Sequence, residues 1–112
     1  MTDVNELTGQ ALREAIAVAK GWQLRDGRWH TLDGRRIDPQ YMPGWDSSLA
    51  AAFGLINGMN YTIEHIKDME NGYSVTLEIF RDMYSGWGET LPLIICRVWL
   101  VMKQAENAKV GV

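Results

Sequence analysis

The residues best suited to bind a ligand are the arginines and tryptophans between Trp22 and Trp45. Arginine guanidinium groups bind phosphate through paired hydrogen bonds, and tryptophan rings stack on nucleobases. Such a set could hold a nucleotide, so we take it as the candidate ligand site. Its members are Trp22, Arg25, Arg28, Trp29, Arg35, Arg36 and Trp45, with His30 among them. The alternative is that Trp22 and Trp29 belong to the core and the arginines are solvated.

Three aromatic residues, one of them already in the candidate site, are predicted to lie in loops just before helices: Trp45, Tyr84 and Trp87. Helix N-termini present backbone N–H groups and a favourable dipole to anions, so these loops could direct donors at one ligand. We favour a packing role, in which each ring contacts the first turn of the helix that follows.

The sequence contains no catalytic or metal-binding constellation. His30 and His65 are the only histidines, and neither has a second histidine or a cysteine at ligand spacing. The single cysteine, Cys96, excludes an intrachain disulfide and a multi-cysteine zinc site, and it suits a small buried position. The glycine motifs of nucleoside-triphosphate and dinucleotide sites are absent. We therefore expect a binding protein without metal or cofactor, not an enzyme.

Charge is distributed unevenly along the chain. Residues 20–36 hold five basic and two acidic residues, a net charge of +3, whereas the whole chain carries −3. This distribution argues against a general nucleic-acid coat and for a small cationic patch. The later acidic residues form a predicted rim that could meet the basic groove of a protein partner: Glu64, Asp68, Glu70, Glu78 and Asp82.

Length and hydropathy indicate one domain over residues 1–112, large enough to bury a core. The longest apolar run, residues 91–102, is short of the ~20 residues that cross a bilayer, and no signal-peptide pattern begins the chain. We expect a cytoplasmic protein without membrane association. Residues 107–112 are predicted to fray.

The first half of the chain predicts a helix followed by a short hairpin. Thr8 can cap a helix that Gly21 ends in a left-handed conformation. The Asp26-Gly27 pair then suits a two-residue turn, which would set Leu24 opposite Trp29 and Arg25 opposite Arg28. Residues 37–44 read as irregular linker.

The second half predicts a helix and two antiparallel strands. The helix starts at Ser48, stops at Asn57-Gly58, and contains Gly54, which usually indicates a close neighbouring backbone. The strands cover residues 60–67 and 72–81, and residues 83–89 are predicted as loop. In the second strand the buried face is formed by Tyr73, Val75, Leu77 and Ile79.

A strongly apolar helix from Leu91 to about Ala105 closes the chain. Its start is marked by Thr90 and Pro92, and Ile95 and Trp99 centre the face expected to pack on the sheet. The opposite face is also apolar, so we expect a homo-oligomer through this helix. The predicted contacts are Leu93, Arg97, Leu100 and Val101. The fold class is then α/β, a small α-β-α sandwich with an antiparallel sheet and three helices, in the order α, short β-hairpin, α, β, β, α.

Three segments, taken in order, resemble the small phage proteins of the phage ABA sandwich domain family. They are Ala19 to Trp22 (AKGW), Pro43 to Phe53 (PGWDSSLAAAF) and Gly88 to Leu100 (GETLPLIICRVWL). The chain departs from the family at Ser48, where an aspartate is usual, and in the last helix, where larger residues replace alanines. The resemblance implies a phage or prophage accessory protein with a sheet sandwiched by helices, and it implies no particular reaction.

These observations together predict a phage-encoded accessory binding protein. The sharper hypothesis is counter-defence, in which the protein sequesters a nucleotide-derived immune signal of its bacterial host. Two alternatives stay open. One is a protein-binding inhibitor of a host defence enzyme or nuclease, acting through the acidic rim. The other is an accessory to phage recombination or replication, which requires DNA affinity that falls steeply with salt.

Overall fold

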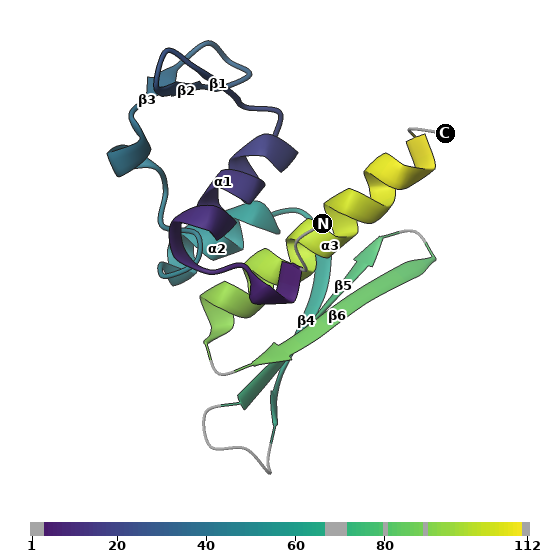
Figure 1. Ribbon diagram of the computed structural model, residues 1–112. Helices are drawn as coiled ribbons and strands as arrows, with labels where there is room; N and C mark the ends of the chain where they lie inside the picture. Colours follow the sequence, from purple (N-terminus) through teal and green to yellow (C-terminus); the bar gives the residue numbers. More distant parts are fainter. Residues whose placement is uncertain (1–3, 67–71, 80, 89, 111–112) are drawn as a thin grey trace.

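Three helices and two small antiparallel sheets make up the chain in the computed structural model, which describes residues 4–66, 72–79, 81–88 and 90–110 (Figure 1). This architecture confirms the predicted α/β class. The helices are α1 (Gly9–Ala19), α2 (Leu49–Leu55) and α3 (Leu91–Val110), with 3₁₀ turns η1 (Val4–Glu6) and η2 (Pro39–Tyr41). The N-terminal sheet contains β1 (Gln23–Arg25), β2 (Arg28–His30) and β3 (Arg36–Ile37), and the C-terminal sheet contains β4 (Asn60–Ile66), β5 (Gly72–Ile79) and β6 (Asp82–Gly88).

The C-terminal sheet packs one face on α3. Val75 and Leu77 of β5 are fully buried there, as are Ile95 and Met102 of α3. Burying each such side chain stabilises the fold by about 1.5–3 kcal/mol. The predicted alternation of β5 is confirmed, because Glu78 on the opposite face is exposed.

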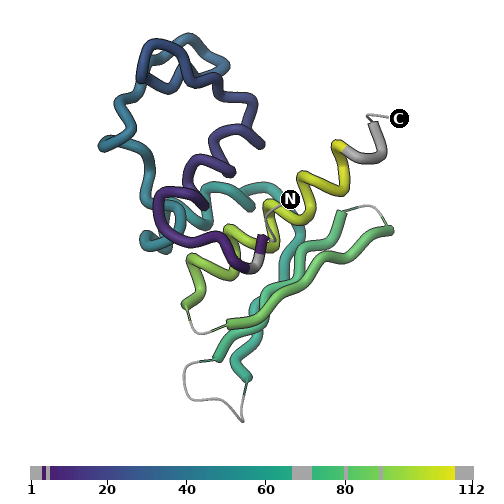
Figure 2. Tube along the Cα trace, in the orientation of Figure 1, coloured from purple at the N-terminus to yellow at the C-terminus, as the bar shows by residue number. Residues whose placement is uncertain are grey.

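The other side of α3 is covered by the chain itself. Helices α1 and α2 and the turn η1 all pack on α3, and η1 lies beside it along the chain trace (Figure 2). Leu100 is thereby only 2% exposed, whereas Val101 is 40% exposed. Arg97 donates hydrogen bonds to the backbone carbonyl of Leu7. The second apolar face is therefore largely buried within one chain, and the homo-oligomer stays a prediction.

The N-terminal sheet has the predicted hairpin register. Leu24 pairs with Trp29 and Arg25 with Arg28, across a turn whose residues Asp26 and Gly27 both have positive φ. Ile37, which was expected to begin an irregular linker, instead forms the third strand β3 together with Arg36. Trp29 is buried and joins this sheet to the core.

The loop predicted over residues 83–89 is wrong, because Asp82–Gly88 forms the edge strand β6. Glycines at 86 and 88 lower the strand propensity, and tertiary packing overrides it. A Cβ on Gly86 would lie 2.8 Å from Cγ2 of Val98, so this glycine lets β6 approach α3 closely. Gly54 was expected to indicate a close neighbouring backbone. This expectation is also wrong, since nothing lies within 4 Å of a Cβ placed on Gly54.

Helices α1 and α2 begin where predicted, directly after Thr8 and Ser48. The Ser48 hydroxyl accepts from the Ala51 N–H, whereas the Thr8 side chain makes no capping hydrogen bond. Helix α3 continues to Val110, beyond the predicted end near Ala105. Among the described residues, no helix has the length and hydropathy needed to span a membrane.

Candidate functional site

Two of the predicted aromatic residues meet where α1 ends and α2 begins. Gly21, at φ +86°, ends α1 and turns the chain, and the Trp22 N–H donates to the Ala17 carbonyl. Trp45 precedes α2. The two indole rings lie 5.5 Å apart between centroids and are tilted by 54°, a favourable arrangement for an aromatic pair.

A partly buried ion pair fixes the segment that carries Trp45. Arg13 of α1 donates through Nε to the Asp46 carboxylate at 2.6 Å and through Nη2 to the Ser47 hydroxyl at 3.3 Å. The Arg13 and Asp46 side chains are only 28% and 14% exposed. Charge-assisted bonds at this depth are stronger than surface ion pairs, so Arg13 holds the start of α2 against α1.

The indole pair opens into a hollow of about 520 Å³, which we call the tryptophan hollow. Lys20 lies beside it, with Nζ 6.0 Å from the centroid of the Trp45 ring, at the outer limit of a cation–π contact. Arg35 and Asp33 form its polar edge. The remaining wall is largely apolar. It includes Ile37, Pro43, Ala51 and Leu55.

Arg35 is held in place by a turn that centres on Thr31. The Thr31 hydroxyl accepts from the Arg35 N–H at 3.0 Å and donates to the Asp33 carboxylate. Arg35 Nε then donates to the same carboxylate at 3.0 Å. The Thr31 hydrogen bond and, to a lesser degree, the Arg35 charge keep the pKa of Asp33 below its ordinary value of 3.8. Asp33 is therefore ionised at neutral pH and partly neutralises Arg35.

A second hollow of about 520 Å³ adjoins the first, and Ile37 and Pro43 line both. We call it the arginine hollow. Arg28 and Arg36 line it together with Asp38 and Tyr41. Arg28 pairs with Asp38 at 3.1 Å, whereas Arg36 forms no ion pair within the described part of the chain. Of the two arginines in this hollow, Arg36 is thus the one with more freedom to bind an incoming anion.

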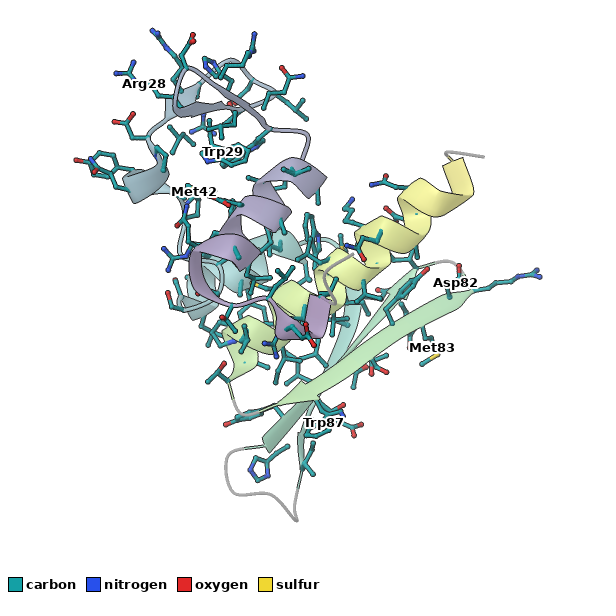
Figure 3. The ribbon with its side chains drawn as sticks, viewed as in Figure 1. Arg28, Trp29, Met42, Asp82, Met83 and Trp87 are labelled. Carbon is teal, nitrogen blue, oxygen red and sulfur yellow. The ribbon has the colours of Figure 1, made fainter. Side chains whose placement is uncertain are left out.

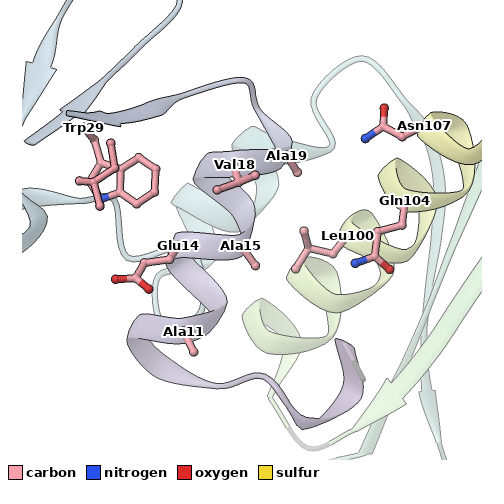
Figure 4. Close-up of a pocket in the computed structure, with 10 residues that line it drawn as sticks. Ala11, Glu14, Ala15, Val18, Ala19, Trp29, Leu100, Gln104 and Asn107 are labelled. Carbon is pink, nitrogen blue, oxygen red and sulfur yellow. The ribbon is translucent and has the colours of Figure 1, made fainter. Parts of the chain in front are cut away.

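The structure distributes the seven predicted site residues over four separate places. Trp22, Arg35 and Trp45 line the tryptophan hollow, and Arg28 and Arg36 line the arginine hollow. Arg25 is exposed and lines neither. Trp29 lines a different groove, of about 540 Å³, between α1 and α3, where Figure 4 shows it across α1 from Leu100.

Lys20 and Tyr41 were missed as lining residues. Lys20 follows the last turn of α1, where a cation is common for reasons of helix stability, so its type carried no ligand signal. Tyr41 lies in η2, within the segment predicted as linker. Its exposed ring reaches the arginine hollow only because the chain folds back after β3.

The expectation that Tyr84 and Trp87 lie in a loop before a helix is wrong, because both belong to β6. Trp87 is 69% exposed and lies with Met83, 67% exposed, on the side of the sheet away from α3 (Figure 3). At the start of α2, the Ser48 hydroxyl already accepts the Ala51 N–H. The Ser48 cap therefore occupies one of the N–H donors at this helix start, and the shared anion site stays a prediction.

Cys96 lies in the core, as expected. Burial, reinforced by the charge of nearby Asp46, raises the pKa of its thiol to about 12. A thiol with that pKa is protonated and unreactive at neutral pH. His65 packs edge-on against the Tyr73 ring. Within the described ranges, no three histidine, cysteine or acidic residues gather as metal ligands do.

Comparison with known proteins gives a structural likeness alone. No protein-family model and no curated protein sequence match the chain. The fold is similar to the crystal structure of a phage protein from Bacillus cereus ATCC 14579, with a TM-score of 0.68 and 17% sequence identity. The match covers 86% of this chain and 92% of that protein. It shows a shared fold, while the resemblance to the phage ABA sandwich domain family stays a prediction.

Proposed function

We propose that this chain is a phage accessory protein that binds a nucleotide-derived anion stoichiometrically in the two adjoining hollows. One observation carries the proposal: a tilted tryptophan pair opens into a hollow that continues into a second one rich in arginine. Each hollow falls within the ~300–1,000 Å³ of typical small-ligand sites. The structural likeness to a phage protein supports the proposed phage origin.

The charges around the hollows suit a phosphate-bearing ligand. Four cationic side chains surround them, against two carboxylates, Asp33 and Asp38. Guanidinium groups bind phosphate oxygens bidentately, and an indole face can stack on a base. The four cations are Lys20, Arg28, Arg35 and Arg36.

The biological role we propose is counter-defence. A protein that binds a host nucleotide immune signal in the cytoplasm of an infected bacterium lowers the free signal without chemical turnover. No catalytic step is required of the residues in either hollow. Bound ligand should accordingly be recovered intact when the protein is denatured by heat.

Calorimetric titration with cyclic dinucleotides, cyclic trinucleotides and cyclic ADP-ribose isomers tests the proposal. We expect one of these to bind with a Kd below about 10 μM. Arg36→Ala should weaken binding about tenfold, the effect of losing one charge-assisted contact of about 1.4 kcal/mol. Arg25→Ala is the matched control, because Arg25 is exposed but lines neither hollow. Absence of binding by all three classes would overturn the proposal.

The alternative of a protein-binding inhibitor has its own support in the C-terminal sheet. The register places Glu64 and Glu78 on the exposed face that also carries Met83 and Trp87. Asp68 and Glu70 of the predicted rim lie outside the described residues. Affinity capture from a bacterial lysate should then yield one host protein, and Glu64→Lys with Glu78→Lys should abolish its capture. A DNA-binding accessory role instead predicts a salt-sensitive mobility shift.

A further inference from the structure

Strand β4 is an open edge of the C-terminal sheet. In the sheet order β4-β5-β6 it pairs with β5 on one side, and its other side has no paired strand within the described residues. Five of its seven residues are exposed. Helix α3 packs mainly on β5 and β6 and leaves β4 at the margin of the sheet. The outward N–H and C=O groups of β4 are therefore a template for a further strand.

The residues of β4 do not block such pairing. Edge strands of natural proteins commonly carry proline, lysine or a bulge, since these features prevent pairing with another chain. Residues 60–66 contain no proline, lysine or arginine, and the register with β5 runs over seven consecutive pairs without a bulge. The opposite edge, β6, contains Gly86 and Gly88, which lower strand propensity. Of the two edges, β4 is therefore the better suited to accept another strand.

The inner face of β4 also carries apolar surface that the chain leaves partly uncovered. Ile63 pairs with Val75, which is buried against α3, so the Ile63 side chain lies on that face. Tyr61, two residues earlier, shares the same face. Its ring contacts Phe53 of α2, with 5.9 Å between centroids, yet Tyr61 is still 46% exposed. A strand added beyond β4 would cover this surface.

We propose that a second copy of the chain occupies this edge, by antiparallel pairing of the two β4 strands about Ile63. The C-terminal sheets of the two copies then form one continuous sheet. Residues opposed in an antiparallel pair lie on the same face, so the two-fold axis must pass at a residue and not between two residues. Ile63 is the middle residue of β4, and only this centre gives every residue of the strand an opposite residue.

The residues that this pairing opposes are complementary. On the inner face Tyr61 meets the partner's His65, which repeats the edge-on contact that His65 makes with Tyr73 across β4 and β5. On the outer face Thr62 meets Glu64 of the partner subunit, so that the hydroxyl donates to the carboxylate. Both contacts occur twice because a two-fold interface is self-complementary. Pairing centred on Glu64 would instead oppose two carboxylates, which is destabilising.

Sedimentation of the full chain tests the interface. We expect the mass of two chains at about 100 μM, from a dimer with a Kd of that order or tighter. Hydrogen exchange should show protection of β4 amides that rises with protein concentration, and no such rise in β6. A chain that sediments as a monomer at this concentration would leave the edge to an extended segment of a different protein, and would overturn the proposal.

A charge placed on the outer face separates pairing from folding. Thr62→Glu sets a carboxylate opposite Glu64 of the partner subunit, and should weaken dimerisation at least tenfold. Within one chain position 62 faces only Thr76, so the fold should persist in circular dichroism. Ser85→Glu is the matched control, because Ser85 is equally exposed in the same row of the sheet but on the opposite edge. It should leave the dimer unchanged, and equal losses in the two variants would contradict pairing through β4.

A second substitution tests the register. Glu64→Lys added to Thr62→Glu opposes unlike charges in the Ile63-centred pairing, so the double variant should recover the dimer. Failure to recover it would rule out this register.

The exposed side of α3 is the other surface at which two copies were expected to meet. Val101→Glu places a charge there and should leave the sedimenting mass unchanged. A mass that falls with Val101→Glu and not with Thr62→Glu would assign the dimer to α3 and overturn the proposal. Both variants lie outside the two hollows, so their outcome does not depend on nucleotide binding.

Discussion

The molecule contains two regions that are held together in different ways. The C-terminal body, formed by α3 and β4–β6, is built on apolar side chains that are fully buried between a helix and a sheet. The N-terminal lobe, residues 22–45, consists of short strands and turns, and is secured by a few anchors such as Trp29, Met42 and Trp45. Trp22 and Ile37 are partly buried, whereas Leu24, Leu32 and Tyr41 are exposed.

This difference indicates how stability and binding are divided. Local unfolding free energies are lowest where few apolar contacts are buried. The lobe should therefore open at a lower free energy than the body, and it carries most of the lining of both candidate nucleotide hollows. A ligand that bridges its turns would also order them.

The largest expected effect tests the body. Ile95→Ala should lower the free energy of unfolding by about 2–5 kcal/mol, because it creates a cavity at a fully buried position. Chemical denaturation measures the loss, and hydrogen exchange should show reduced protection in both regions. Val101→Ala, on the exposed side of the same helix, is the control and should cost less than about 1 kcal/mol. Loss of protection confined to the body would contradict the dependence of the lobe on α3.

An intermediate effect tests the attachment of the lobe. Asp46→Asn leaves the half-buried Arg13 without its anion and should cost about 1–2 kcal/mol. Because the pair joins α1 to the segment before α2, faster exchange should appear around Trp22 and Trp45 and spare β5. Glu106→Gln removes the partner of Lys103 on the outer surface of α3 and should cost less than about 0.5 kcal/mol. Equal losses of unfolding free energy in the two variants would contradict the role of the Arg13–Asp46 pair in attaching the lobe.

The two regions also differed in how far their sequences predicted them. Local signals were sufficient for the hairpin, because Asp26 and Gly27 both accept positive φ and thereby set the register of Leu24 and Trp29. They failed for β6, where Gly86 is required by the short distance to Val98, a tertiary contact with the next element, α3. Periodicity predicted the buried face of α3 around Ile95, but not that α1 would cover the opposite face.

The candidate site was predictable in its residue types and not in its layout. Alternation of arginine and tryptophan indicated a cationic aromatic surface, and Trp22 with Trp45 does form one wall. The division into two hollows depends on residues 38–43, which bring Asp38 and Tyr41 back against the arginines. No local sequence pattern predicts that residues 38–43 fold back against the arginines, because their path is set by the pairing of β3 with β2.

The smallest expected effect lies in the lobe and concerns the ionisation of Asp33. Its pKa is lowered in the folded chain, so its contribution to stability is present above the ordinary pKa of 3.8 and is lost as the pH falls through the lower, folded value. Thr31→Val preserves shape but removes the hydrogen bond that is the main cause, and should move the Asp33 pKa back towards 3.8. Carboxyl chemical shifts recorded between pH 2 and 6 measure this directly. If the Asp33 pKa does not move, the Arg35 charge and not the Thr31 hydrogen bond is the main cause of its lowering. Arg35 would then be less free to bind an anion than the turn geometry indicates.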